Sequence, residues 1–208
     1  MQVTVFGASG KVGRLVVDRL IASGHTVTAF VHKSDPFQDM SGVNVIQGSV
    51  SDASSVNRAV NGSDAVISTL GSWASPSEAV VSTGASQIIE AMALTNAQRL
   101  VTLTGASAFY SLDKPGLTAK WTRKLLKMIA PKILLDGENH LRSLEGSKLD
   151  WTCVRSPAMT SGNSSSYHLS DKLPTLIAFV PRNAVAKCLV DQLEDTNFIK
   201  KAPVIYRG

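Results

Sequence analysis

The sequence predicts the α/β fold class, a mostly parallel sheet with helices on both faces. Short β-branched apolar runs alternate with longer amphipathic stretches, and the first apolar run leads directly into a glycine-rich turn. Such alternation is typical of βαβ units, and the complete order predicts a Rossmann-type, doubly wound sheet. The expected strands are 2–6, 26–31, 43–47, 64–69, 98–104, 151–155 and 202–206. The expected helices are 11–23, 52–61, 76–95, 117–130, 132–147 and 182–194.

Residues with strong backbone preferences mark where several of these elements begin and end. Gly24 can close the first helix in a left-handed conformation. Asp52 can cap the second expected helix, and Asn61 with Gly62 ends it. Pro131 divides the helical stretch before the sixth strand in two, because proline fits the first turn of a helix and not its interior.

The length of the chain is that of one domain. The 208 residues contain no internal repeat, low-complexity tract or linker, so residues 1–208 are expected to fold together. No apolar run reaches the roughly 18 residues of a membrane helix, so no membrane span is expected. The first strand begins at Gln2, which leaves no room for a leader peptide and favours a cytoplasmic location.

Charge and cysteine content narrow the classes of ligand. The net charge of +5 favours an anionic ligand. Nucleic acid is not expected, because the sequence has neither a basic patch interleaved with aromatic residues nor a recognition-helix pattern. Cys153 and Cys188 fit neither a disulfide framework nor a zinc site, and no metal-ligand spacing occurs elsewhere. Cys153 lies in an apolar run and is expected to be a buried, unreactive thiol.

The clearest binding motif is Gly7-Ala8-Ser9-Gly10-Lys11-Val12-Gly13, between the first strand and the first helix. Phosphate binding at such a turn needs close backbone approach and free N–H groups at a helix N-terminus. Gly7 permits the tight turn, Gly10 lets the backbone lie against a pyrophosphate, and Gly13 lets the helix pack against the sheet. The spacing is G-x-x-G-x-x-G, so the G-x-G-x-x-G fingerprint applies by analogy. The other residues expected to contact the phosphates are Ser9, Lys11, Val12 and Arg14.

Three stretches of the chain resemble one family. They are the loop Gly7–Gly13, Asp64–Gly71 at the fourth strand, and Leu149–Pro157 around the sixth. They are similar to the NAD(P)H-binding, NmrA-like group of the atypical short-chain dehydrogenase/reductases, which includes flavin and biliverdin-IXβ reductases. The resemblance covers most of the chain. It implies a Rossmann fold and a nicotinamide dinucleotide, and it says little about the reaction.

The end of the second strand bears on the choice of cofactor. In NAD-selective Rossmann sites, a carboxylate there binds the ribose 2′-hydroxyl. In this chain His32 and Lys33 follow the strand, and the first acid is Asp35. Lys33 and a protonated His32 attract a 2′-phosphate, and Arg14 could add a third cation, so NADP(H) is preferred over NAD(H). The resembling family often has arginine where His32 stands, so the charge depends on pH in this chain.

Two further turns are expected beside the cofactor. Ser49 stands where the family commonly places an aspartate near the adenine, and a hydroxyl would bind the adenine amino group more weakly. The resemblance also implies that Ser68–Gly71 passes beneath the cofactor ribose. The residues expected at these turns and at the end of the fifth strand are Ser49, Val50, Thr69, Leu70, Gly71 and Thr104.

The sequence offers no convincing catalytic acid. Short-chain dehydrogenases that reduce ketones use a tyrosine and a lysine four residues apart on one helical face, and only Tyr110 and Lys114 have that spacing. Pro115 follows at once, and a residue before proline is pushed out of the helical region. This pair is therefore expected in a loop. The remaining candidates for a catalytic role are Thr104 and Ser107, whose hydroxyls could face the nicotinamide.

The acceptor pocket is expected at the carboxyl ends of the strands, where open α/β sheets bind ligands. The C-terminal part, about 155–208, is expected to contribute to it. His140 is expected on the surface of its helix rather than at this site. The candidate lining residues, each of which could equally be ordinary packing, are Trp73, Phe109, Tyr110 and Met159.

The helix expected at 117–130 is basic on one side and apolar on another. Its apolar positions recur at helical spacing, and no acid lies between Lys114 and Lys132. We expect it to dock on the sheet and expose its cations to solvent. The alternatives are an acidic partner, a membrane surface or an anionic substrate. The apolar residues are Leu117, Trp121, Leu125 and Met128, and the basic residues between the two lysines are Lys120, Arg123, Lys124 and Lys127.

Three functions remain open at this point. The first is an NAD(P)H-dependent oxidoreductase that transfers hydride to a small conjugated acceptor such as a flavin or quinone, which needs no protein acid. The second is a non-catalytic, NmrA-like redox sensor that binds the dinucleotide and contacts other proteins. The third, an enzyme like the sugar-nucleotide epimerases, is disfavoured because few residues follow the sixth strand. A homodimer is compatible with each function.

Overall fold

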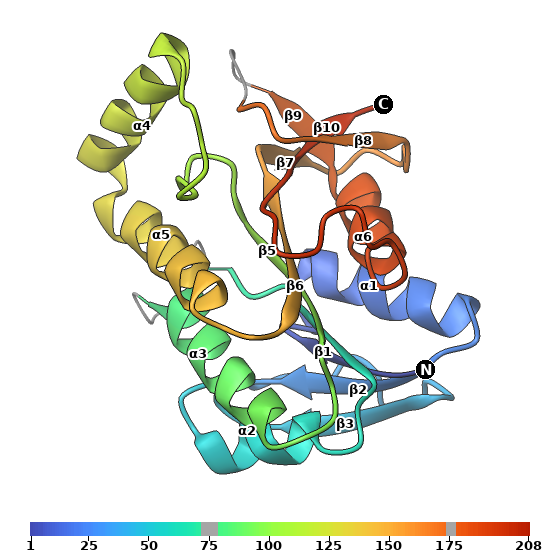
Figure 1. The fold of residues 1–208 in the computed structure, drawn as a ribbon. Helices are drawn as coiled ribbons and strands as arrows, with labels where there is room; N and C mark the ends of the chain where they lie inside the picture. The colour runs from blue at the N-terminus through green and yellow to red at the C-terminus, as the bar shows by residue number, and fades with distance from the viewer. Residues whose placement is uncertain (72–78, 174–177) are drawn as a thin grey trace.

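The computed structural model describes residues 1–71, 79–173 and 178–208. Within them, eight strands form one sheet in the order β3-β2-β1-β4-β5-β6-β10-β8 (Figure 1). All are parallel to their neighbours except β8, which runs antiparallel to β10. The strands are β1 Gln2–Phe6, β2 Thr26–Val31, β3 Val43–Gln47, β4 Ala65–Ser68, β5 Arg99–Gly105, β6 Asp150–Ser156, β8 Tyr167–Ser170 and β10 Val204–Arg207. Two short strands, β7 Ala158–Thr160 and β9 Phe179–Pro181, form a second sheet.

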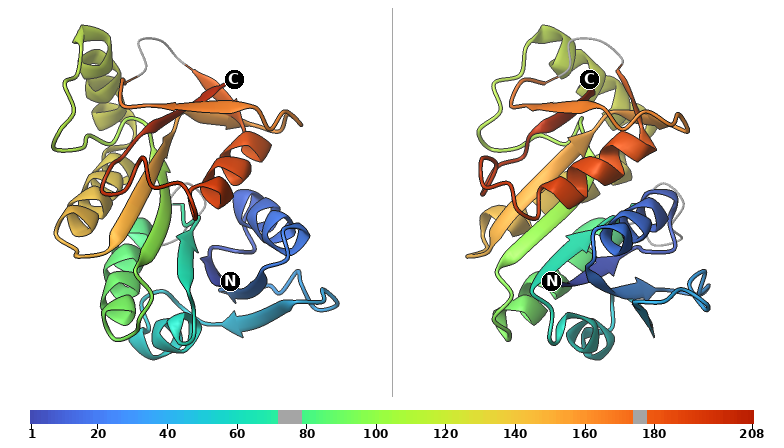
Figure 2. Two further views of the ribbon diagram at one scale, coloured as in Figure 1. Left: turned by 45° about the vertical axis from the view of Figure 1, so that its right-hand side comes forward. Right: turned by 90° about the vertical axis from the view of Figure 1, so that its right-hand side faces the viewer.

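Helices cover both faces of the larger sheet (Figure 2). Side chains of α1 and α6 share one apolar cluster with the sheet, and side chains of α2, α3 and α5 share another on the opposite face. The predicted Rossmann-type, doubly wound architecture is therefore confirmed. The helices are α1 Lys11–Ala22, α2 Ala53–Val60, α3 Val80–Ala93, α4 Leu117–Ile129, α5 Pro131–Glu145 and α6 Arg182–Asp191.

The predicted boundary residues act as expected. Gly24 follows α1 with a φ of 78°, in the left-handed region. The Asp52 carboxylate accepts hydrogen bonds from the backbone N–H groups of Ser54 and Ser55 at the start of α2. Pro131 is the first residue of α5. All seven expected strands form to within two residues at each end, and β7, β8 and β9 are additional to them.

The expectation that the basic helix docks on the sheet is wrong. None of the residues of α4 is buried, and α4 packs against α5 instead (Figure 1). The apolar spacing was the only reason to expect burial against the sheet, and a periodic apolar face does not say what covers it.

The strand register brings several turns to one edge of the sheet. Phe6, the last residue of β1, lies beside Phe30 near the end of β2 and beside Ser68 at the end of β4. In the same way, Thr104 near the end of β5 lies beside Arg155 of β6. Because these strands are parallel, the segments that follow them meet at the carboxyl edge, where open α/β sheets bind ligands.

Candidate functional site

The glycine turn after β1 is held in place by Thr69. Gly7 has a φ of 73°, which residues with a side chain rarely adopt. The Thr69 hydroxyl donates to the carbonyl oxygens of Phe6 at 3.0 Å and Gly7 at 3.1 Å. A Cβ on Gly7 would lie only 3.0 Å from that hydroxyl oxygen. Thr69 therefore shapes the turn, and its expected contact with the cofactor stays a prediction.

Gly13 allows α1 to lie close to the turn. A Cβ at this position would lie 2.2 Å from the carbonyl oxygen of Gly7 and 2.8 Å from the Cα of Ala8. Backbone atoms cannot give way as a flexible side chain can, so any larger residue would push the helix away from the turn. This contact agrees with the packing role that the sequence predicted for Gly13.

The N-terminus of α1 is arranged to receive an anion. Gly10 is the N-cap residue, is exposed, and forms no side-chain cap with any described residue. The first intrahelical bond runs from the Arg14 N–H to the Gly10 carbonyl at 3.0 Å. The N–H groups of Lys11, Val12 and Gly13 precede it and have no partner within the helix. A phosphate fits this end of the helix, since the free N–H groups and the helix dipole both favour a negative charge.

In the strand order β4 lies beside β1, and β3 lies on the other side of β1 with β2 between them, so the turns after β3 and β4 flank the glycine turn. Ser49 is half-buried, and its hydroxyl accepts a hydrogen bond from the Ser51 N–H at 3.2 Å. Val50 and Leu70 pack beside Gly84 of α3, where a Cβ would lie 2.4 Å from the Leu70 Cδ1. Gly71, the last described residue before the gap, is exposed. Gly71 is thus the most accessible of the residues predicted at these two turns.

The residues after β2 are exposed and basic. His32 and Lys33 are held through their carbonyl oxygens, which accept from the Gln47 side chain at 3.3 Å and 3.4 Å, so both side chains are available. Arg14, also exposed, donates from Nε to the carbonyl oxygen of Ser9 at 3.0 Å. The cations expected to attract a 2′-phosphate therefore remain on the surface beside the glycine turn.

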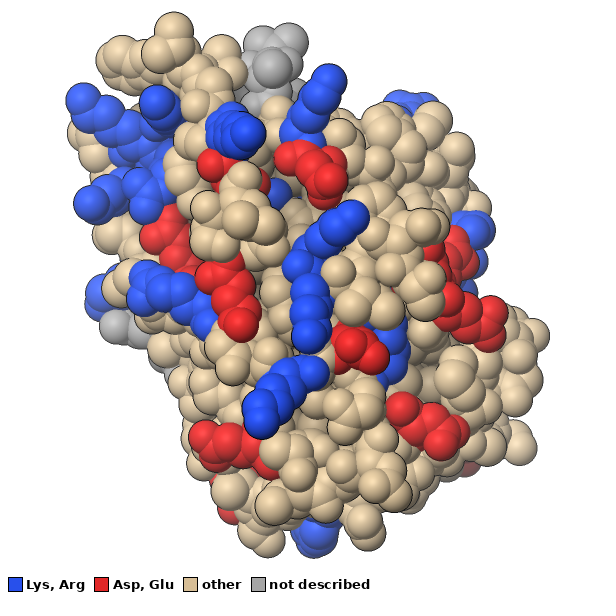
Figure 3. Space-filling model, viewed as in Figure 1, with Lys and Arg blue, Asp and Glu red and all other residues tan. Residues whose placement is uncertain are grey.

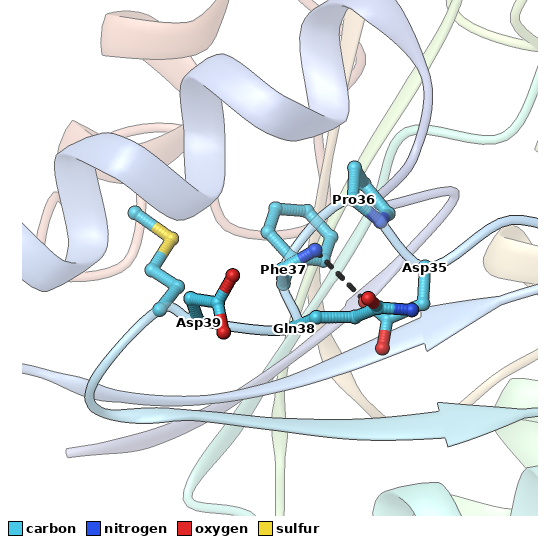
Figure 4. A pocket seen from close by; sticks show the side chains of 6 residues that line it. Asp35, Pro36, Phe37, Gln38 and Asp39 are labelled. Carbon is cyan, nitrogen blue, oxygen red and sulfur yellow. Dashed lines mark hydrogen bonds between the residues drawn. The ribbon is translucent and has the colours of Figure 1, made fainter.

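A hollow of about 430 Å³ lies further along the same loop (Figure 4). Asp35 and Asp39 contribute carboxylates to its wall, and Phe37 is buried beneath it. The Asp35 carboxylate is already engaged, because it accepts from the Phe37 N–H at 2.8 Å. Two carboxylates in the wall disfavour a phosphate, so this hollow is a poor match for a nucleotide phosphate.

The end of β5 faces α5 rather than a catalytic pair. Thr104 is half-buried, and its hydroxyl would lie 3.0 Å from a Cβ on Gly137 of α5. Ser107 is half-buried two residues beyond the strand. The whole of α5 is described, and its buried face has neither tyrosine nor lysine. The buried residues of α5 are Leu134, Asp136, Gly137, His140, Leu141 and Leu144.

The expectation that His140 lies on the surface is wrong, because its side chain is 1% exposed. Burial lowers the pKa of His140 to about 4, although the nearby Asp136 opposes the shift. Asp136 is itself buried and accepts from the N–H groups of Val81 and Ser82 at the start of α3. The spacing to Leu144 could have revealed the burial, since residues four apart share a helical face.

Tyr110 lies far from the carboxyl edge of the sheet. Its hydroxyl donates to the Lys200 carbonyl at 3.1 Å, and its ring packs edge-on against Trp151 near the start of β6. Trp151 precedes Ser156, the end of that strand, by five residues, or roughly 16 Å. Lys114 is in the loop before α4, as expected. Tyr110 thus has its hydroxyl and ring toward the start of β6, although the Arg155 Cζ lies 6.0 Å from its ring centroid, and its roles in catalysis and the acceptor pocket stay predictions.

The other expected pocket residues have contacts of their own. Phe109 lies beneath the Arg123 guanidinium of α4, 4.9 Å from its ring centroid. Met159, in β7, is half-buried against the apolar cluster of α1 and α6. Trp73 lies outside the described residues. Phe109 and Met159 therefore each have a packing contact, and their place in an acceptor pocket stays a prediction.

Arg155 and Asp113 form a buried ion pair that was not predicted from the sequence. The Arg155 side chain is 1% exposed and donates to both oxygens of the Asp113 carboxylate, at 2.5 Å and 2.8 Å. It also donates to the carbonyl oxygens of Ala202 and Ala108. The pair ties the loop after β5 to β6 and to the segment before β10. A basic residue inside an apolar strand was the only available signal.

The Cys153 thiol agrees with the sequence-based prediction. Cys153 is buried, and burial raises the pKa of its thiol to about 12, so it is an unreactive thiol as predicted. Among the described residues, no group of three or more His, Cys, Asp or Glu side chains could hold a metal ion. The described helices include none that is long and apolar enough to cross a membrane.

A family model described as NAD(P)H-binding matches residues 7–196, which include the glycine turn and most of the sheet. The chain belongs to this NAD(P)H-binding family. The predicted likeness to the NAD(P)H-binding group is thus confirmed. The ligand class of this family is the nicotinamide dinucleotides, whose phosphates suit the glycine turn and the free N-terminus of α1.

Solved structures share the fold of this NAD(P)H-binding protein. A short-chain dehydrogenase/reductase from Veillonella parvula, solved in complex with NADP, is 20% identical, with a TM-score of 0.81 over 99% of this chain and 94% of that one. The anaerobilin reductase ChuY from Escherichia coli O157:H7 is 19% identical, with a TM-score of 0.82 over 100% and 97%. A putative NAD-dependent epimerase/dehydratase from Bacillus halodurans is 20% identical, with a TM-score of 0.80 over 100% and 94%. At these identities the likeness establishes the fold.

Proposed function

We propose that this chain is an NADPH-dependent reductase of a conjugated acceptor such as a flavin or quinone. One observation carries the proposal. The carboxyl edge combines an anion-binding glycine turn with an α5 whose buried face has neither tyrosine nor lysine. Such an edge can hold a hydride donor, and it offers no tyrosine–lysine acid of the ketone-reducing kind.

The preference for NADP(H) over NAD(H) rests on the end of β2. His32 and Lys33 are exposed there, and the nearest acid of the loop, Asp35, is occupied by the Phe37 N–H. A 2′-phosphate beside Lys33 would gain a charge-assisted hydrogen bond that a 2′-hydroxyl cannot form. The NADP complex of the Veillonella parvula neighbour supports this assignment.

The chain contributes binding and alignment rather than acid–base chemistry. A bound nicotinamide dinucleotide supplies a hydride, that is, two electrons and one hydrogen nucleus. The turn at Gly7–Gly13 would hold the pyrophosphate, and Thr104 with Ser107 would border the place where the acceptor lies. Reduction also requires one proton. A flavin or quinone spreads the incoming charge over its ring system, so water can deliver that proton without a protein acid.

The test is NADPH oxidation against a panel that contains a flavin, a quinone, a simple ketone and an aldehyde. We expect turnover with the flavin or quinone, and a Tyr110→Phe variant within a few-fold of the wild-type rate. If the ketone were the preferred substrate and Tyr110→Phe lowered the turnover rate by about 10²–10⁴-fold, Tyr110 would be a general acid and the proposal would be contradicted. Tight NADPH binding without turnover on any acceptor would contradict the enzyme and favour the sensor.

A further inference from the structure

Helix α4 exposes a continuous apolar face. Five of its side chains are each 56–77% exposed, although large apolar residues usually find a partner in a folded protein. They recur at three- and four-residue intervals, so they form one stripe along the helix. The residues of this stripe are Leu117, Trp121, Leu125, Met128 and Ile129.

Within residues 1–71, 79–173 and 178–208, the stripe points away from the contact between α4 and α5. α4 packs against α5, and Arg123 forms an ion pair with Glu138 of that helix, with an Nε–Oε1 distance of 2.8 Å. Ala119 and Leu126 share the side of Arg123 and are half-buried. At 100° per residue, the direction of Trp121 is roughly 160° from that of Arg123. The side of α4 that contacts α5 is thus the side opposite the stripe.

Lysines border the stripe on one side. Lys120, Lys124 and Lys127 are exposed, and at 100° per residue they share the sector between the α5 contact and the stripe. The Lys124 ammonium lies 5.4 Å from the Trp121 ring centroid. No acid occurs between Asp113 and Asp136 in the sequence. The view in Figure 3 shows this concentration of positive charge over the α4 side of the molecule.

We propose that α4 lies on an anionic lipid surface, parallel to it, with the stripe among the acyl chains and the lysines at the headgroups. A helix that is apolar on one face and lysine-rich beside it, with low net hydrophobicity, has the composition of an interfacial membrane helix. Tryptophan is favoured at that boundary, and lysine side chains can extend from the apolar layer to the phosphates.

The charge of the lysines favours a lipid surface over a second copy of the chain as the partner of the stripe. A twofold contact through the stripe would place the same patch on both sides, so lysines would approach lysines. An anionic bilayer supplies the complementary charge along the whole helix, and each lysine near such a surface strengthens binding about fivefold. The inference does not depend on the reductase activity, since the lipid contact uses residues outside the dinucleotide site.

The experiment is vesicle flotation of the full chain, with phosphatidylcholine vesicles and with vesicles that also contain phosphatidylserine. We expect binding to the phosphatidylserine vesicles and loss of it at high salt. Leu125→Glu should reduce the bound fraction at least tenfold, as should the triple change of Lys120, Lys124 and Lys127 to Glu. The matched controls are Leu94→Glu and Lys148→Glu, which change an exposed leucine (78% exposed) and an exposed lysine outside α4. Both variants should bind the vesicles as the wild type does.

Two results would overturn the inference. One is equal flotation of wild type and the α4 variants, which would mean that another surface binds lipid. The other is no flotation of the wild type, together with a dimer in light scattering that Leu125→Glu converts to a monomer. Circular dichroism and NADPH titration of each variant would show that the fold is retained, so a failure of the reductase proposal remains distinguishable.

Discussion

The glycine turn and the segment from the end of β5 through α4 are held in different ways. In the turn, backbone geometry leaves no choice of residue, because a Cβ on Gly13 would lie 2.2 Å from the Gly7 carbonyl oxygen. The later segment depends on a few side-chain contacts, chiefly the pairing of Asp113 with Arg155 and of Arg123 with Glu138. Regions of the first kind can be predicted from sequence spacing. Regions of the second kind depend on partners that lie far away in the chain.

The largest expected effect comes from breaking the second kind of restraint. Asp113→Ala would leave the Arg155 guanidinium buried without its counter-charge, so we expect the free energy of unfolding to fall by about 3–5 kcal/mol. Urea denaturation measures this quantity. Asp18→Ala removes an exposed carboxylate from α1 and should change stability little. A loss below about 1 kcal/mol for Asp113→Ala would show that the pair does not anchor the loop.

The sequence predicted the sheet well because its strands are continuous apolar runs bounded by strong signals. β7, β8 and β9 were missed because they have only three or four residues each, too short for a periodic pattern. The burial of His140 was missed because a single polar residue on an apolar helical face resembles a surface residue. The unpartnered stripe of α4 was missed because periodicity reports an apolar face and not what covers it.

The next expected effect is a pH dependence of stability that comes from the core beside α5. The pKa of His140 is about 4 in the folded chain and about 6.5 when unfolded, so between these values the unfolded state binds more protons. Stability is therefore complete above about pH 6.5 and falls as the pH decreases toward 4. Between pH 7.5 and pH 5 the loss from this residue should be about 2 kcal/mol.

His140→Leu separates that contribution from those of other groups. The variant lacks the titrating ring, so its free energy of unfolding should change less between pH 7.5 and pH 5 than that of the wild type, by about 2 kcal/mol. Denaturant titrations at the two pH values supply the comparison. Identical pH dependence in the two proteins would mean that His140 is accessible to protons in the folded state.

A smaller effect, on cofactor affinity, is expected at the end of β2, a strand whose position the sequence predicted correctly. Lys33→Glu should weaken NADPH binding about tenfold and leave NADH binding nearly unchanged, because only NADPH carries a 2′-phosphate for the lysine to bind. Lys148→Glu makes the same change in net charge at an exposed site near the end of α5. Equal weakening of both cofactors, or of NADPH in both variants, would argue against a specific contact at Lys33.

Part of the candidate site could be predicted from the sequence, because backbone geometry restricts the residues allowed there. Gly7, Gly10 and Gly13 are required by backbone approach, which spacing reveals. The hydrogen bonds from the Thr69 hydroxyl to the carbonyl oxygens of Phe6 and Gly7 could not be predicted, because they depend on how β4 lies beside β1. Tyr110 was a candidate because of its spacing to Lys114, and only the fold shows that the loop carries it to the far end of β6.

Calorimetric titration of NADPH into wild type and Gly10→Val tests the central claim, that the dinucleotide binds at the glycine turn. Gly10 has an extended backbone that valine can adopt, and a Cβ there would lie 3.1 Å from the Gly7 carbonyl oxygen, so the fold should persist with a small adjustment. The valine side chain would stand over the N–H groups of α1. We expect at least a tenfold loss of affinity, about 1.4 kcal/mol, and none in the control Ala22→Val at the other end of α1. Unchanged NADPH affinity in a folded Gly10→Val variant would contradict the account.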